Sequence, residues 1–180
     1  MQHRCNGKAW AMALVIAGAS LAATQAGAQP RNFAPITDGA YLKECGTSCH
    51  MALPPELLPA RSWRKVMASL AEHFGESAQV DAAMHQRITD YLVAHAADQA
   101  RNAQSMAVMA SLKADEAPLR ITQTPYVGGM HAVVLDPLWG GDPRPKTLVE
   151  CNVCHVNSER GVYTERRFSV TDAAFRPGRR

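Results

Sequence analysis

Apolar positions between residues 59 and 75 recur at the spacing of an α-helix. Large apolar side chains return every three or four residues, which places them on one face. Proline suits the first turn of a helix and glycine its end, so we expect this helix to begin near Pro59 and to run to about Phe74, before Gly75. The predicted buried stripe consists of Trp63, Val66, Met67, Leu70 and Phe74.

A second helix is predicted from Ser77 or Gln79 to about Ala97. A shorter helix is predicted over Gly39–Cys45, upstream of a proline-rich turn that cannot be helical. The buried face of the second helix is predicted to carry Met84, Ile88, Tyr91, Leu92 and His95.

The pattern weakens after residue 97. Residues 98–117 carry a thin apolar line that favours a short helix closing at Pro118. Residues 119–145 are interrupted by Gly128-Gly129 and Gly140-Gly141, which predicts loops with at most one short pair of strands. A last helix is predicted from near Pro145 through His155. The fold class is therefore expected to be mainly α, with helices joined by long loops.

The first 28 residues are typical of a secretory signal peptide. Arg4 and Lys8 precede an apolar stretch over residues 10–23, and small residues surround a cleavage site near Ala28. The apolar stretch is shorter than the roughly 18–20 residues that span a bilayer. We therefore expect cleavage near Ala28, export to the periplasm, and no membrane span in the mature chain.

Four cysteines remain after the predicted cleavage, and each lies in a short motif that ends in histidine. The motifs are Cys45-Gly-Thr-Ser-Cys49-His50 and Cys151-Asn-Val-Cys154-His155. The second is C-x-x-C-H, the attachment signature of c-type haem, in which two thiols bond the porphyrin and the next imidazole ligates the iron. Disulfides and zinc are the alternatives for paired cysteines. We favour haem because neither alternative explains both histidines.

Charge and length add two constraints. The net charge is only +3, and no lysine-rich run is interleaved with aromatics, which argues against nucleic-acid binding. About 150 residues follow the signal peptide, enough for one compact domain or two very small ones. We predict an N-terminal haem domain over residues 29–117 and a C-terminal haem domain over residues 118–180, one around each motif.

His50 and His155 are the predicted proximal iron ligands, and the sequence offers several candidates for the opposite face. His73 ends the first long helix, and His131 follows a glycine pair that we interpret as a loop hinge. His95 competes from the predicted buried face of the second helix, whereas His85 lies at the edge of that face. Position alone leaves these candidates open. The remaining candidate is Met130.

The order of motifs resembles the small soluble dihaem cytochrome c family, periplasmic electron donors whose partner is an oxygen-binding monohaem cytochrome. The resemblance covers nearly the whole mature chain. It rests on Glu44 to His50, Pro54 to Pro59, Trp63, His73-Phe74-Gly75, Arg120-Ile121-Thr122, Thr124-Pro125-Tyr126, His131, Cys151 to His155, and Gly161-Val162-Tyr163.

This resemblance implies helices and long loops wrapped around two covalently attached c-type haems. Family members have two bis-histidine, low-potential, low-spin haems, which implies His73 and His131 as the distal ligands. By proximity in sequence, we assign His73 to the first haem and His131 to the second, with a crossed arrangement as the alternative. Cys45, Cys49, Cys151 and Cys154 are implied as the attachment residues.

The first motif departs from the family pattern because three residues, not two, separate its cysteines. We expect Gly46 to take unusual backbone angles that accommodate the extra residue, so that both thioethers form. The alternatives are that only Cys49 bonds the haem, or that no covalent bond forms at this motif.

Two function classes follow. With two imidazoles on each iron no position is open to a substrate, which predicts an electron-transfer protein rather than an enzyme. Its partners would be redox proteins, such as an oxygen-binding monohaem cytochrome c or a membrane cytochrome. The alternative is a haem-based gas-binding or peroxidase-like protein with one open iron site.

Overall fold

The computed structural model describes residues 31–47, 50–135 and 151–164. The predicted signal peptide, Cys49 and the predicted helix start near Pro145 lie outside these residues. The described residues form α-helices and 3-10 turns without a strand; the only β pairing in them is two isolated bridges. The predicted mainly α fold class is confirmed.

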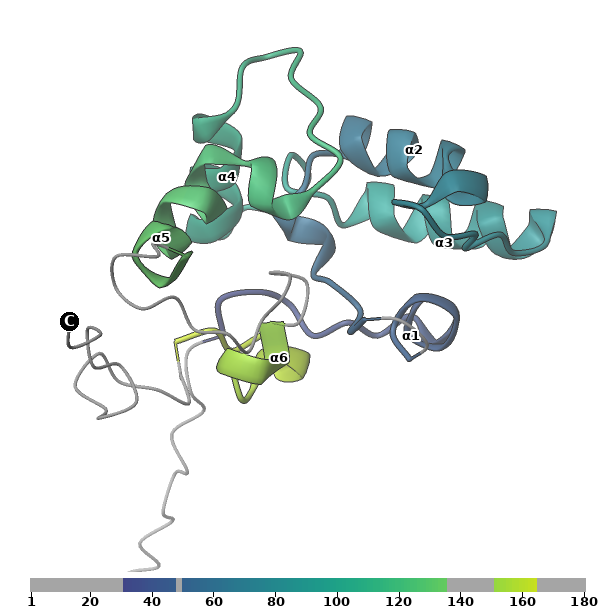
Figure 1. Ribbon diagram of the computed structural model, residues 1–180, viewed down its shortest axis with the longest axis horizontal. Helices are drawn as coiled ribbons and strands as arrows, with labels where there is room; N and C mark the ends of the chain where they lie inside the picture. Colours follow the sequence, from purple (N-terminus) through teal and green to yellow (C-terminus); the bar gives the residue numbers. More distant parts are fainter. Residues whose placement is uncertain (1–30, 48–49, 136–150, 165–180) are drawn as a thin grey trace, which may run out of the picture.

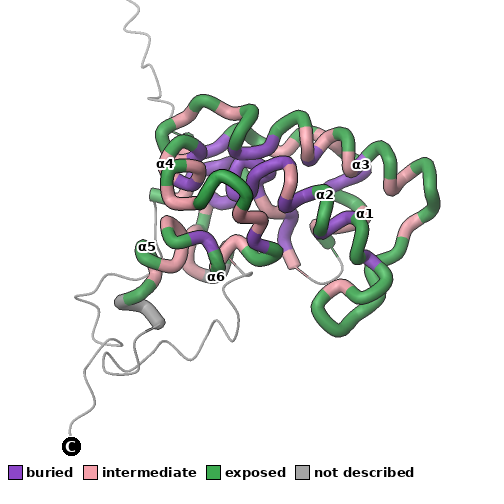
Figure 2. The backbone as a smooth tube through the Cα atoms, turned by 90° about the horizontal axis from the view of Figure 1, so that it is seen from above, coloured by how far each residue is buried: buried purple, intermediate pink, exposed green. Residues whose placement is uncertain are grey.

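The centre of the structure is a pair of packed helices, α2 (Ala60–Ala68) and α3 (Ala82–Ala94), which lie side by side in Figure 1. Their facing side chains are fully or almost fully buried, as the purple segments of Figure 2 show. The first four residues of the predicted stripe face the core, but the prediction that Phe74 is buried was wrong, since it lies beyond the helix end and is 45% exposed. The core residues of this pair are Trp63, Val66, Met67, Ile88 and Leu92.

Both helices are shorter than their apolar patterns predict. α2 ends at Ala68, because the Ser69 hydroxyl bonds the carbonyls of Lys65 and Val66, and one 3-10 turn (η2, Leu70–Glu72) follows. α3 starts only at Asp81, whose carboxylate accepts a hydrogen bond from the Met84 amide.

The prediction that His95 lies on the buried face of α3 was wrong. His95 follows the last helical residue, Ala94, and its side chain is exposed. The turn that closes the helix there swings the ring away from the core and onto Tyr91, at a centroid distance of 4.4 Å.

The predicted helix over Gly39–Cys45 is confirmed as α1. Asp38 caps it by accepting a hydrogen bond from the Tyr41 amide. Tyr41 is buried, and its hydroxyl donates to the carbonyl of Leu53 and accepts from the Leu53 amide. These bonds hold the first cysteine motif against the proline-rich turn, which contains the 3-10 helix η1 (Pro55–Leu57).

Residues 121–123 and 125–135 are helical, which corrects the prediction of loops there. The 3-10 turn η3 (Ile121–Gln123) leads into α5 (Pro125–Leu135), which runs through Gly128-Gly129 and packs on α4 (Ala103–Ser111). The buried Thr124 starts α5, since its hydroxyl accepts from the Val127 amide, and proline follows in the first turn. This start signal outweighs the low helix propensity of two glycines.

The first and last described segments are joined. The amides of Asn32 and Phe33 donate to the Gly161 carbonyl at 2.8 and 3.1 Å, and the Tyr163 amide donates to the Asn32 side chain. The rings of Phe33 and Tyr163 meet edge to face at 5.2 Å. The two predicted haem domains are therefore in direct contact, whereas the boundary at residue 117 stays a prediction.

The second cysteine motif lies between α5 and this junction. Cys151–Cys154 forms the single turn α6, and the 3-10 turn η5 (Ser158–Arg160) follows it. No helix in the described part of the chain has the length and apolar character needed to cross a membrane.

The buried Glu56 links three segments. Its carboxylate accepts hydrogen bonds from the amide of Ala34 and from the side chain of Asn102, which also caps α4. Burial, the largest influence, raises the pKa of Glu56 despite these donors. The folded protein therefore holds the Glu56 proton more tightly than the unfolded chain does.

Glu56→Gln should flatten the pH dependence of stability. Because the folded-state pKa is raised, the Glu56 contribution is present below the ordinary carboxyl pKa and is lost as pH rises through the raised value. Thermal unfolding midpoints of the holoprotein from pH 4 to 7 measure this: the wild type should lose stability relative to Glu56→Gln as pH rises. Asp115→Asn, at an exposed loop position, is the control. A wild type that gains stability relative to Glu56→Gln as pH rises would contradict the assignment.

Gly161→Ala should destabilise the protein by about 2 kcal/mol or more. Gly161 has φ 77°, and an added methyl would collide with the Phe33 carbonyl. Denaturant unfolding measures the loss. The same change at Gly129, in α5 with open space around it, should be neutral or stabilising; equal effects at the two positions would contradict this account.

Candidate haem sites

The first histidine pair consists of His50 and His73. The Nδ1 of His50 lies 2.7 Å from the carbonyl of Met51, which can only accept, so Nδ1 is the donor in this bond and Nε2 lies on the other side of the ring. His73 stands in a tight turn after η2, where its amide and carbonyl both pair with Glu76. The two rings are 6.4 Å apart between centroids and 30° from parallel.

The second histidine pair consists of His131 and His155. His131 lies on α5, where its Nδ1 donates to the Val127 carbonyl at 2.8 Å. His155 follows α6 directly, and its amide donates to the carbonyl of Cys151. The two rings are 6.1 Å apart and close to perpendicular, at 82°.

Both separations match the span of two imidazoles on one metal ion. Two metal–imidazole bonds of about 2 Å each, with each nitrogen about 1.1 Å from its ring centre, put the centroids about 6 Å apart. Direct stacking of two rings would bring the centroids closer, as for Tyr91 and His95 at 4.4 Å. The structure thus brings His50 together with His73 and His131 together with His155, whereas the assignment of these histidines to particular haems stays a prediction.

The surroundings of both pairs also fit a large apolar group. Next to three of the four histidines a large apolar side chain is exposed: Phe74 at 45%, Met130 at 68% and Val156 at 43%. Beside His155, the hydroxyl of Tyr163 is buried with no hydrogen-bond partner among the described residues. The apolar surface of a porphyrin would cover these exposed side chains. Its propionates would accept a hydrogen bond from the Tyr163 hydroxyl.

Three of the four predicted attachment cysteines, Cys45, Cys151 and Cys154, lie in the described residues. Cys45 ends α1, and Cys151 and Cys154 bound α6. Burial raises the pKa of Cys45 and of Cys151 to about 11, so both are neutral thiols at pH 7. Within the described ranges, no three His, Cys, Asp or Glu side chains converge as they would around a zinc ion.

Electrostatics favour the neutral form of His73. Burial is the largest influence that lowers its pKa, and His50 and then Arg120 act in the same direction. A neutral imidazole is the form that ligates a metal.

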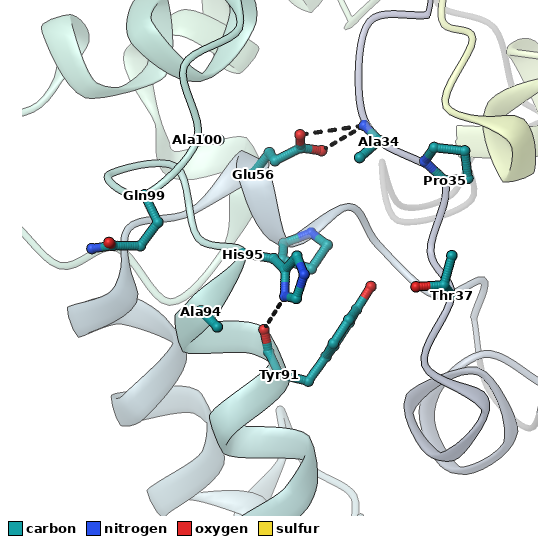
Figure 3. Close-up of a pocket in the computed structure, with 10 residues that line it drawn as sticks. Ala34, Pro35, Thr37, Glu56, Tyr91, Ala94, His95, Gln99 and Ala100 are labelled. Atoms are coloured by element: carbon teal, nitrogen blue, oxygen red, sulfur yellow. Dashed lines mark hydrogen bonds between the residues drawn. The ribbon is translucent and has the colours of Figure 1, made fainter.

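The rival histidines have other partners. His85 points Nε2 at the Met67 carbonyl at 3.0 Å. His95 donates from Nδ1 to the Tyr91 carbonyl and borders a pocket of about 420 Å³ with Glu56, Tyr91 and Thr37 (Figure 3). None of the eight predicted site residues lines this pocket.

Close contacts, and not unusual backbone angles, explain the glycine at position 46. Gly46 has φ −104° and ψ −4°, so the predicted unusual backbone angles are wrong. An added Cβ would instead lie 2.6 Å from the Leu42 carbonyl oxygen and 3.0 Å from Ala52 Cβ. The turn after α1 thus needs a residue without a side chain so that the chain can fold back on the helix.

Phe74 was not identified as a site residue from the sequence. It has φ 56°, unusual for an aromatic residue, and its ring lies 4.7 Å from that of His73. The Arg120 guanidinium lies over the Phe74 ring, with its central carbon 3.9 Å from the ring centroid. The adjacent glycine, Gly75, is the only sequence signal for this turn, and nothing in the sequence pairs Phe74 with Arg120.

These features define a helical protein with two histidine pairs, each beside a cysteine motif, spaced to hold iron in haem. The chain matches the dihaem cytochrome c family over residues 41–163. It belongs to that family and carries two covalently attached c-type haems, which confirms both the predicted resemblance and the predicted cofactors.

Solved structures agree with this membership. The diheme cytochrome c from Rhodobacter sphaeroides is 38% identical, with a TM-score of 0.63, covering 72% of this chain and 98% of that one. The diheme cytochrome sb-DHC from Shewanella baltica OS155 is 29% identical, with a TM-score of 0.55, covering 73% and 97%. A search of curated proteins gave no match.

Gly46→Ala should lower haem attachment at the first motif only. The methyl group would push the Leu42 carbonyl and Ala52 apart and displace the segment between Cys45 and His50. Intact-mass measurement after expression with cytochrome maturation should show a larger one-haem fraction. Gly39→Ala, at the open end of the same helix, should keep two haems. A fully two-haem Gly46→Ala protein would contradict this reasoning.

Proposed function

We propose that this protein is a periplasmic electron carrier with two bis-histidine, low-spin haems. His50 and His73 would ligate the first iron, and His131 and His155 the second. The separation of the two rings in each pair, 6.4 and 6.1 Å, is the observation that carries the proposal. Membership of a family of haem electron-transfer proteins supports the same activity.

When bound, haem iron supplies one-electron redox chemistry. The task of the chain is to hold the two imidazoles of each pair in the same place in both oxidation states. At His50 and His131 a backbone carbonyl fixes the ring through Nδ1 and leaves Nε2 as the ligating atom. With two imidazoles held for each iron, water and substrates would have no iron position to occupy, which favours electron transfer over an enzymatic role.

Attachment would use both cysteines of each motif. Cys45 and Cys49 would bond the first haem, and Cys151 and Cys154 the second. For the longer first motif, the sharp turn at Gly46 supports two thioethers, because it takes up chain length directly after Cys45.

Localisation and partners follow from the sequence features. We infer that residues 1–28 are a signal peptide and that the mature protein acts in the periplasm, the compartment in which c-type haems would be attached. Its partners would be redox proteins that accept or donate single electrons, such as an oxygen-binding monohaem cytochrome c or a membrane cytochrome. Nucleic acid is not among the expected partners.

Replacing a distal histidine should open one iron. His73→Ala and His131→Ala should each convert one of two haems from low to high spin, and the reduced variants should bind carbon monoxide at that haem. Absorption spectra with and without carbon monoxide measure both effects.

His85→Ala and His95→Ala are matched controls, since their rings bond other carbonyls, and they should keep the wild-type spectrum. Carbon monoxide binding by the reduced wild type as fast as by reduced His73→Ala or His131→Ala would favour the gas-binding or peroxidase-like alternative, because a filled iron position should slow it strongly. Low-spin spectra in both His73→Ala and His131→Ala would refute the ligand assignment.

A further inference from the structure

His73 is held differently from His50 and His131. Those two rings are each fixed by a hydrogen bond from Nδ1 to a backbone carbonyl. No hydrogen bond from the described residues reaches the His73 ring, which instead rests against Phe74 at 4.7 Å and 59°. The orientation of this imidazole therefore depends on how firmly Phe74 is held.

Phe74 also contacts Arg120. The ring is nearly half exposed, and its backbone has φ 56°, so neither burial nor the local conformation fixes it. The Arg120 guanidinium covers the ring face at 3.9 Å, well within the range of a cation–π contact. The order of contacts is thus guanidinium, phenyl ring, imidazole.

Arg120 is itself anchored to the segment that carries the other distal histidine. The side chain of Gln123 accepts hydrogen bonds from the amides of Leu119 and Arg120, which sets the direction of the chain before α5. α5 begins two residues later and carries His131. The continuous segment from Arg120 to His131 therefore contacts Phe74 at the first site and carries a histidine of the second.

We propose that Arg120 is a positioning residue for the first site: by clamping Phe74 it fixes the orientation of the His73 imidazole, and its charge favours the reduced state of the first haem. This inference rests on the proposed function, because it requires His73 to be an iron ligand. In this role Arg120 acts on the His73 ring through its contact with Phe74. It acts on the first haem through its positive charge.

The test uses the holoprotein and the variants Arg120→Met and Phe74→Leu. Electron paramagnetic resonance of the oxidised protein reports the relative orientation of two imidazoles on a low-spin iron. The two pairs differ in ring angle, 30° against 82°, so we expect two separable signals. Each variant should shift the signal of the first haem and leave that of the second unchanged.

Two further readouts accompany the spectrum. Carbon monoxide should bind to the reduced first haem about fivefold faster in Arg120→Met than in the wild type, because His73 would leave the iron more readily. This factor corresponds to the loss of one exposed cation–π contact. Redox titration should show a lower potential for this haem in Arg120→Met but not in Phe74→Leu, which keeps the charge. The double variant should match the single ones in carbon monoxide rate, because both remove the same restraint.

Arg101→Met, at an exposed position in the loop before α4, is the charge control and should leave both signals and both potentials unchanged. Should Arg120→Met fail to accumulate, Arg120→Lys keeps the charge, loses the planar contact, and should give the shifted signal with an unchanged potential. Wild-type signals and carbon monoxide rates in these Arg120 variants would overturn the inference. The proposed function would then still stand if His73→Ala gives a high-spin haem, and would fall if it does not.

Discussion

The distance between paired imidazole rings is the constraint on which the rest of the structure depends. Each pair joins a histidine that directly follows a cysteine motif to one held on a separate element, the turn after η2 for His73 and α5 for His131. A shift of either element by one ångström would spoil the spacing of about 6 Å. The buried contacts of α2, α3, α4 and α5 therefore serve to keep four side chains at two fixed separations.

Fixed separation does not make the two sites equal. The first pair is close to parallel and the second close to perpendicular. The restraints also differ, since a carbonyl fixes the ring of His131, whereas an aromatic ring supports that of His73. Under the proposed ligation, the two haems thus meet different surroundings within one small protein, which gives the chain a means of setting their properties separately.

Sequence reasoning succeeded where one local signal dominates. The C-x-x-C-H motif, the apolar stripe of α2 and the capped helix α1 are each readable from a few neighbouring residues. It failed where distant contacts decide. Gly128-Gly129 was interpreted as a hinge, yet α5 is helical there because Thr124 starts it and α4 supports it. At Gly46, contacts with Leu42 and Ala52 matter, and they are invisible in the sequence.

The candidate site shows the same division. The four histidines and four cysteines come from motifs and from the family resemblance. The contact between Phe74 and Arg120 does not, because 46 positions separate two residues that neither periodicity nor spacing relates.

The junction of Asn32 with Gly161 and Tyr163 has a consequence for biosynthesis. A hydrogen bond across 131 positions forms only after the ribosome has added nearly the last residue of the matched region. Until then the two ends are apart, and the first cysteine motif emerges long before the second. The two ends can therefore join only after residue 163 has been synthesised, which makes their closure a late step of folding.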